Sequence, residues 1–244
     1  RKRIRAACHV HSDWSYDGKW PLEKLAAAFS KRGYQVVMMT EHDRGFDEKR
    51  RLEHREACRN ASTDQILIVP GIEYSDKDNC VHILVWGDVP FVGVDVETEK
   101  ILGAVSACQA VAVMAHPTRR QAWRSFRPAW KADLLAIEIW NRKTDGWAPS
   151  RDAGPLLEQT GALPFVGLDF HEHRQFFPMA TILDVESAIS EDSVLVAMRA
   201  RRCESEVFGR PIGRFSSGFA ERTLRATEFF RRRAAPVFRK FRSS

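Results

Sequence analysis

Most histidines in this chain stand where an apolar segment meets a polar turn, and most have a carboxylate nearby. Imidazole and carboxylate groups together are the ligand set of zinc, iron and manganese. Placement at strand ends would bring several of them to one face of a sheet or barrel. The sequence therefore predicts a multinuclear metal site. The six histidines placed in this way are His9, His11, His42, His82, His116 and His171.

Two pairs repeat one spacing: His9 and His11 in ACHVHSDWSYD, and Asp169 and His171 in PFVGLDFH. Residues i and i+2 of a strand point to the same face, so each pair could share one ion. Taken singly, these residues could be hydrogen-bonded structural histidines or helix caps. Their coincidence at six strand ends favours metal binding.

Two further carboxylates fit the same pattern. Asp17 lies in the loop that leaves the first predicted strand, and Glu73 ends another strand, where it could bridge two ions. Each also has an ordinary interpretation. Asp17 precedes Gly18 and is typical of a turn, and Glu73 could cap a loop.

The elements that must position these residues alternate along the chain. Strands are predicted at 4–11, 35–40, 65–69, 81–86, 110–115, 134–140 and 165–168. Helices are predicted at 21–32, 47–62, 97–109, 152–161 and 187–202, with a partly helical segment at 120–131 that Pro128 interrupts. Strands that alternate with helices and end in polar groups predict a closed barrel with its site on that rim. An open doubly wound sheet is the alternative, although no glycine-rich phosphate loop follows the first strand.

Composition is that of a single-domain enzyme. A chain of 244 residues, 44% of them hydrophobic, can bury one large core. No stretch approaches the roughly 18–20 apolar residues of a membrane span, and no signal peptide is visible. The five cysteines form no CxxC pair, so we expect Cys8 in the core and the protein in a reducing, cytoplasmic compartment.

The net charge of +6 is concentrated at the two ends of the sequence. Residues 1–5 carry four basic side chains and residues 231–242 carry six, with no acidic residue in either segment. The remaining 28 basic residues are outnumbered by 32 acidic ones. The sequence therefore predicts no dedicated nucleic-acid groove across the fold.

Taken together, the motifs resemble a known family, the PHP (polymerase and histidinol phosphatase) superfamily. The resemblance covers about residues 4–210, in the motifs CHVHSDWSYDG, TEHD, GIEYS, VHILVWG, AHP, IEIWN and GLDFH. It implies a distorted (β/α)7 TIM-like barrel over 1–215, with the metal site at the C-terminal ends of the strands, and a basic, partly amphipathic extension over 216–244. Glu41 replaces the usual Asp, and Leu168 and Phe170 replace small residues. These departures put the pocket shape in question but remove no ligand.

The resemblance also assigns ligands for three divalent ions. His9, His11, Glu73 and Asp169 would hold the first ion. Glu73 would bridge to a second, completed by His82 and His116. Asp17, His42 and His171 would hold the third. We therefore expect two to three zinc, manganese or iron ions, with Glu73, Asp169 and His171 as catalytic residues.

Two ions roughly 3.5–4 Å apart would acidify a bridging water to hydroxide and stabilise charge on an attacked phosphate. We expect a metal-dependent phosphoesterase acting on a phosphorylated small molecule, either a phosphate monoester or a small phosphodiester. Candidate phosphate-binding residues are the loop arginines Arg44, Arg119, Arg142 and Arg174. The alternatives are a protein-tyrosine phosphatase of the PHP type, an amidohydrolase-like C–N or ester hydrolase, and a catalytically silent metal-binding scaffold. Amidohydrolases usually carry a bridging lysine where this chain has Glu73.

Three other features need an interpretation. Glu138 is expected to support a ligand or pack in the barrel, His54 is expected in solvent, and His173 is a weaker candidate for substrate contact.

Residues 219–241 alternate aromatics with arginines. They could form an interfacial helix broken at Pro236, or a tail packed on the barrel. The first interpretation predicts weak contact with anionic surfaces through 219–242. No candidate ligand lies beyond His171, so we expect the metal site to be independent of this extension.

Overall fold

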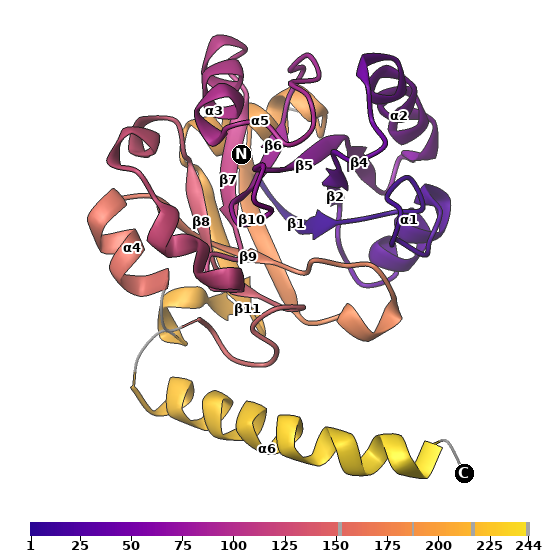
Figure 1. The fold of residues 1–244 in the computed structure, drawn as a ribbon. Coiled ribbons are helices and arrows are strands. Elements are labelled where there is room, and N and C mark those ends of the chain that lie inside the picture. The colour runs from indigo at the N-terminus through magenta and orange to yellow at the C-terminus, as the bar shows by residue number, and fades with distance from the viewer. Residues whose placement is uncertain (151–152, 187, 216–217, 243–244) are drawn as a thin grey trace.

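The computed structural model describes residues 1–150, 153–186, 188–215 and 218–242, with the backbone alone over 235–242. Its described residues form a mixed α/β fold of two six-stranded sheets surrounded by helices (Figure 1). The predicted mixed α/β class is confirmed.

The first sheet contains the N-terminal strand. Its order is β12-β11-β10-β1-β2-β4, with β1 parallel to β2 and antiparallel to β10. The strands are β1 (Lys2–Val10), β2 (Val36–Met39), β4 (Leu67–Val69), β10 (Met179–Val185), β11 (Cys203–Val207) and β12 (Arg210–Pro211). The last three strands are not predicted from the sequence, and they extend this sheet beyond β1.

The second sheet has the order β3-β5-β6-β7-β8-β9. Its strands are β3 (Glu41–His42), β5 (Gly71–Ser75), β6 (His82–Trp86), β7 (Val111–Ala115), β8 (Ala136–Asn141) and β9 (Leu163–Gly167). Strand β6 is antiparallel to both β5 and β7. His82 therefore starts its strand, and this N-terminal end lies beside the C-terminal ends of its neighbours. The site expected at the C-terminal ends of the strands therefore includes, at His82, the N-terminal end of an antiparallel strand.

Hydrogen bonds join the two sheets where β9 ends. Leu168 N–H donates to the carbonyl of Cys8 at 3.0 Å, and Phe170 N–H donates to that of His9 at 3.0 Å. On the other side, Pro70 alone separates β4 of the first sheet from β5 of the second. These links bring the strand ends of both sheets together, while the closed seven-stranded barrel stays a prediction.

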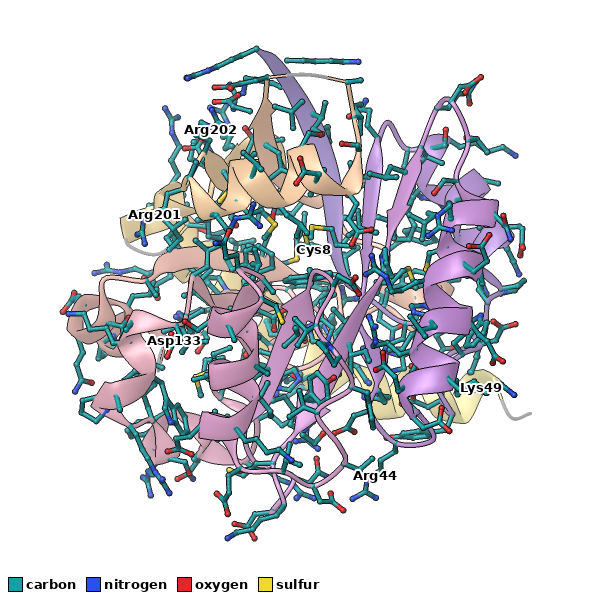
Figure 2. The ribbon with its side chains drawn as sticks, turned by 90° about the horizontal axis from the view of Figure 1, so that it is seen from above. Cys8, Arg44, Lys49, Asp133, Arg201 and Arg202 are labelled. Atoms are coloured by element: carbon teal, nitrogen blue, oxygen red, sulfur yellow. The ribbon has the colours of Figure 1, made fainter. Side chains whose placement is uncertain are left out.

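The interior core lies between the two sheets. Side chains from β1 and β2 pack there against side chains from β6, β7 and β9, including the fully buried Ile4 and Trp86. Cys8 belongs to the same cluster, as expected, and lies in the middle of the molecule in Figure 2. The opposite faces of the strands are covered by helices.

The helices are α1 (Leu22–Ser30), α2 (Glu48–Ala61), α3 (Thr98–Ala107), α4 (Ala153–Thr160), α5 (Glu191–Arg199) and α6 (Gly218–Arg242). In α1, Leu22, Leu25, Ala26 and Phe29 are buried at the i, i+3, i+4, i+7 spacing of one helical face. Short 3₁₀ turns occupy Arg119–Ser125 and Pro128–Ala132, on either side of the predicted break.

Three predicted helix boundaries need comment. The predicted starts at Asp152 and Ser187 lie outside the described residues. Helix α6 continues past Pro236, so the predicted break there is wrong. It begins at Gly218, close to the predicted domain boundary, and that boundary stays a prediction. Among the helices described, none is long and apolar enough to cross a membrane.

Candidate metal centre

Three residues of the site have backbone conformations that L-amino acids rarely adopt. The φ angle is +60° at His9, +24° at His116 and +48° at Asp169. Positive φ is uncommon outside glycine, and such strain is concentrated at functional sites. All three residues lie at or just beyond the end of a strand, where the predicted ligands gather.

A β-bulge brings His9 and His11 together. The register of β1 against β2 shifts between Cys8 and Val10, and the strand ends before His11. The two histidines are fully buried, with ring centroids 5.3 Å apart. The two rings are close, as the sequence predicts, but the bulge at His9 interrupts the simple strand alternation on which that prediction rested.

The Glu73 carboxylate stands at the centre of the cluster, with five imidazole rings around it. Its Oε1 lies 2.7 Å from Nδ1 of His82 and 3.0 Å from Nε2 of His116. Its Oε2 lies 3.2–3.5 Å from ring nitrogens of three more histidines. These three are His9, His11 and His42. Each oxygen faces its own group of rings, as expected of a carboxylate shared between two cations.

Two aspartates complete the cluster. Asp169 Oδ1 lies 3.8 Å from His9 Nε2, 3.7 Å from His11 Nε2 and 3.3 Å from His171 Nδ1. Asp17 lies between two rings, with Oδ1 3.3 Å from His42 Nε2 and Oδ2 3.1 Å from His171 Nε2. All nine predicted ligands therefore lie in one cluster.

The donor atoms fit divalent metal ions. Seven of the nine residues form three overlapping groups whose ligand atoms lie within 4.8 Å of one another. The groups are His9–His11–Asp169, His9–Glu73–His116 and His11–His42–His171. Nε2 of His9 and Nε2 of His11 are buried, and neither has a hydrogen-bond partner among the described residues. Since buried polar atoms are nearly always paired, two such nitrogens facing carboxylates suit a cation between them.

The cluster also sets the protonation of its own members. Burial opposes ionisation of Glu73, but the charges of His9 and His82 and hydrogen bonds from other rings hold the pKa of its carboxyl well below the ordinary value. Burial and the neighbouring His42 and His171 lower the pKa of His11. An ionised carboxylate and a neutral imidazole are the states that bind metals. Burial opposes the charge of His9, but Glu138, Asp169 and Glu73 raise its pKa well above the ordinary value, so metal binding would release a proton from this ring.

Glu138 orients the ring of His9. The carboxylate is fully buried, and its Oε1 lies 2.7 Å from His9 Nδ1. Its Oε2 accepts the backbone N–H of His116 at 2.7 Å and the side-chain amide of Asn141 at 2.9 Å. A side chain in place of hydrogen at Gly167 would put its Cβ 1.7 Å from Oε1, so this glycine makes room for the carboxylate. Such a partner fixes the ring so that Nε2 faces the metal.

Glu41, the departure from the family's usual Asp, supports the opposite side of the cluster. It is fully buried and accepts hydrogen bonds from the backbone and hydroxyl of Ser12 and from the hydroxyl of Ser15. The same Ser15 hydroxyl lies 3.3 Å from His11 Nδ1. Glu41 thus positions the loop that follows His11 and is not itself one of the nine predicted ligands.

His54 is buried, although it was expected in solvent. Its side chain is only 1% exposed and its Nε2 lies 3.6 Å from Glu41 Oε1 and 3.3 Å from Cys58 Sγ. The expectation of a solvated histidine is wrong, because this face of the charged helix α2 packs against the body of the protein.

A cavity of about 220 Å³ opens onto the cluster, lined by Glu73 and Asp169 and by the cations Arg44, Arg119 and Lys143. Arg119 donates to Asn79 and lies 3.1 Å from His82 Nε2, whereas Arg44 is paired with Asp95 at the periphery (Figure 2). Lys143 was not among the cavity residues predicted from the sequence. Its Nζ lies 3.1 Å from His171 Nε2, and its position after the IEIWN motif was the available signal.

The other two predicted arginines lie outside this cavity. Arg142 donates to the carbonyl of Arg174 and lies over the ring of Phe177. Arg174 is exposed and paired with Glu172. The exposed His173 lies beside Trp20 and Phe176, also away from the cavity. The structure therefore does not support substrate contacts for Arg142, Arg174 or His173.

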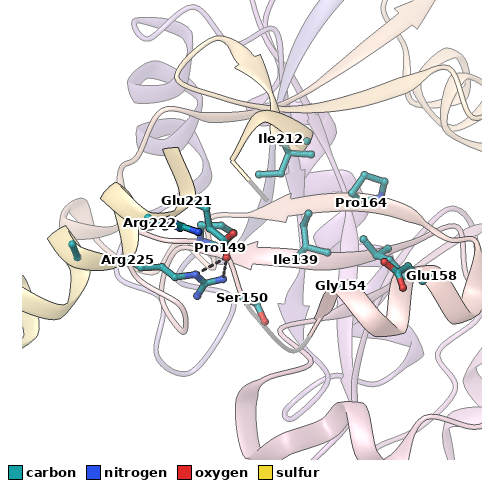
Figure 3. Close-up of a pocket in the computed structure, with 13 residues that line it drawn as sticks. Ile139, Pro149, Ser150, Gly154, Glu158, Pro164, Ile212, Glu221, Arg222 and Arg225 are labelled. Atoms are coloured by element: carbon teal, nitrogen blue, oxygen red, sulfur yellow. Dashed lines mark hydrogen bonds and ion pairs between the residues drawn. The ribbon is translucent and has the colours of Figure 1, made fainter. Parts of the chain in front are cut away.

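A larger cavity of about 900 Å³ lies between α4 and α6 (Figure 3). None of the nine predicted ligands lines it. The chemistry predicted from the sequence therefore belongs to the smaller cavity.

No family model and no curated protein matches the sequence. Solved structures do. A two-domain protein from Bacteroides vulgatus that contains a predicted PHP-like metal-dependent phosphoesterase aligns with 84% of this chain, at a TM-score of 0.65 and 15% identity. The chain has a PHP-like fold. The predicted resemblance to the PHP superfamily is confirmed at this level.

Two more solved structures are similar in fold to this chain. PsfC from Pseudomonas syringae aligns with 95% of the chain, at a TM-score of 0.64 and 13% identity. The lesion-specific endonuclease PfuEndoQ from Pyrococcus furiosus aligns with 82% of it, at a TM-score of 0.56 and 13% identity. The chain spans 65% of the Bacteroides protein, 99% of PsfC and 56% of the endonuclease.

Proposed function

We propose that this protein is a metal-dependent phosphoesterase that hydrolyses a phosphate monoester or a small phosphodiester. The observation that carries the proposal is the Glu73 carboxylate among five imidazoles, beside two buried imidazole nitrogens that lack hydrogen-bond partners among the described residues. The PHP-like fold supports it. The (β/α)7 barrel belongs to the same proposal, with β9 and β1 as neighbours.

The assignment of ligands to ions is the one that the family resemblance implies. His9, His11, Glu73 and Asp169 would hold one ion, Glu73 with His82 and His116 a second, and Asp17 with His42 and His171 a third. When bound, zinc, manganese or iron ions supply Lewis-acid stabilisation of phosphate charge and lower the pKa of water. Glu138 keeps the proton of the His9 ring on Nδ1, so that Nε2 remains free to bind.

The cavity residues favour a phosphorylated substrate. Arg119 and Lys143 both line this cavity, Arg119 beside His82 and Lys143 beside His171. A phosphate held between them would meet cationic donors from both residues. Tyr16, 73% exposed, stacks on the His42 ring at the same cavity and offers an aromatic surface to the rest of the substrate. A volume of about 220 Å³ suits a small molecule.

A substrate screen tests this proposal. Protein stripped with a chelator is reloaded separately with zinc, manganese and iron, then assayed on an aryl phosphate, an aryl phosphodiester, a phosphotyrosine peptide, a lactone and an amide. We expect metal-restored hydrolysis of the aryl phosphate or phosphodiester, and much less with Glu73→Gln. Preference for the phosphotyrosine peptide would favour the tyrosine phosphatase. Cleavage of the lactone or amide alone would favour the amidohydrolase. If the metal-loaded protein turned over none of these substrates, the metal-binding scaffold would be favoured.

A further inference from the structure

We infer that the C-terminal helix α6 is a positioning element of the candidate metal centre, acting through the loop from Asn141 to Trp147. The inference concerns the site of the proposed function, but it rests on how α6 packs. This loop follows β8 and brings Lys143 to the cluster. Helix α6 lies along the end of the molecule from which the loop projects (Figure 1).

Glu228 is the main contact between the helix and the loop. It is only 6% exposed, on a helix that is otherwise mostly exposed or half-buried over its described side chains. Its Oε2 accepts the backbone N–H of Trp147 at 3.0 Å, and Arg231 and Arg232 donate to the same carboxylate. Arg232 also donates to the carbonyl of Asp145 at 3.2 Å. Burial together with charge-assisted hydrogen bonds makes this a fixed contact.

The loop is shaped to receive Glu228. Gly146 has a φ of +81°, and a Cβ at that position would lie 2.2 Å from Glu228 Oε1. Only glycine combines this conformation with so close an approach. The helix therefore supplies a buried carboxylate, and the loop supplies a glycine that leaves room for it.

Hydrogen bonds continue from the loop to a predicted ligand. Asp145 accepts the backbone N–H of Asn141 and the hydroxyl of Thr118, each at 2.8 Å. The Asn141 side chain donates to Glu138 at 2.9 Å, and Glu138 orients His9. Helix α6, the loop and the candidate metal centre are thus joined through the loop backbone, the half-buried Asp145 and the buried Asn141 and Glu138.

This arrangement revises the expectation that the metal site is independent of the extension. The face of α6 that carries Glu228 belongs to the scaffold of the site. Phe219 and Phe230 are exposed by 86% and 68% and project into solvent, whereas the half-exposed Phe229 lines a cavity beside the loop. The predicted contact of that outer surface with anionic membranes or polyanions stays a separate prediction.

Two pairs of variants test the inference. Glu228→Ala removes the contact from the helix side, with Glu221→Ala as its control. The pair of Glu221 with Arg225 lies within α6 (Figure 3). Gly146→Ala disturbs the contact from the loop side, with Gly161→Ala as its control. Gly161 also has positive φ, but a Cβ there would meet no atom within 4 Å.

Two measurements on the zinc-loaded full chain decide the outcome without an enzymatic assay. Hydrogen exchange should speed up roughly tenfold at the loop amides, including those of Thr144 and Asp145, in Glu228→Ala and Gly146→Ala. Zinc affinity, measured by chelator competition, should fall about tenfold in both variants, as when a partner that orients a ligand is lost. Glu228→Gln keeps an acceptor for Trp147 N–H but loses the charge that Arg231 and Arg232 bind, so both values should lie between those of the wild type and Glu228→Ala.

The inference is overturned if loop exchange and zinc affinity in these variants match those of their controls. If Glu228→Ala does not fold, Gly146→Ala decides by the same criteria. A protein that binds zinc but hydrolyses no phosphate ester would contradict the proposed function and leave this test intact. Where turnover is measurable, displacement of Lys143 should raise KM for an aryl phosphate more than it lowers kcat.

Discussion

Replacing Glu138 by glutamine should damage the metal centre without changing the size of any side chain. Oε1 of Glu138 faces His9 Nδ1, while Oε2 accepts two hydrogen bonds, from His116 N–H and from the Asn141 amide. A carboxylate accepts on both oxygens, but a glutamine has one acceptor and one donor. The substituted side chain therefore cannot serve both sides.

The number of donors decides which way glutamine turns. Its oxygen should face the two donors, since leaving them unpaired would cost about 1–3 kcal/mol each. Its amide then faces His9 Nδ1, which must become an acceptor, and the ring proton moves to Nε2. That nitrogen faces Glu73 and Asp169 at 3.5 and 3.8 Å, and once protonated it cannot bind a metal.

Loss of a group that orients a metal ligand costs roughly 10- to 100-fold in affinity, or about 1.4–2.7 kcal/mol. Zinc affinity measured by chelator competition should fall by that factor in Glu138→Gln. The control is Glu97→Gln, which makes the same chemical change at an exposed residue paired with Lys77. Wild-type zinc affinity in Glu138→Gln would refute the tautomer argument.

Three further predictions concern neighbouring residues. Gly167→Ala should expel the Glu138 carboxylate, because the new Cβ would lie 1.7 Å from its Oε1. Both the melting temperature and the zinc affinity should therefore fall. An unchanged value of either would contradict this contact. Glu73→Gln should lose at least one metal by elemental analysis and roughly a thousandfold in turnover, and near wild-type turnover would show that Glu73 is misassigned. Arg119→Ala should raise KM for an aryl phosphate while Arg174→Ala leaves it unchanged, and the reverse result would contradict the cavity assignment.

The periodicity of the sequence predicts most of this fold and the members of the cluster. Apolar segments that end in His42 or His116 are buried strands whose ends meet on one rim. Strand direction is not encoded in the same way. The apolar pattern after His82 is compatible with either strand direction. Only pairing with β5 and β7 shows that β6 is antiparallel to both.

Side-chain direction in loops was harder to predict. Arg142 and Lys143 are neighbours after the same strand, yet only Lys143 lines the cavity. The turn that separates them depends on Asn141 and Asp145 and on the docking of α6, which are long-range contacts. The prediction that His54 is exposed to solvent was wrong for a related reason. Its polar helix packs one face against the body, where His54 lies beside the buried carboxylate of Glu41.

The metal content of the purified protein tests the central claim most directly. After gentle purification and reconstitution with zinc, manganese or iron, elemental analysis should find two to three equivalents per chain. The same analysis of a His9→Ala/His11→Ala variant should find fewer, since both unpartnered ring nitrogens would be gone. Less than one equivalent in the wild-type protein, or equal content in the variant, would contradict the assignment of this cluster as a metal centre.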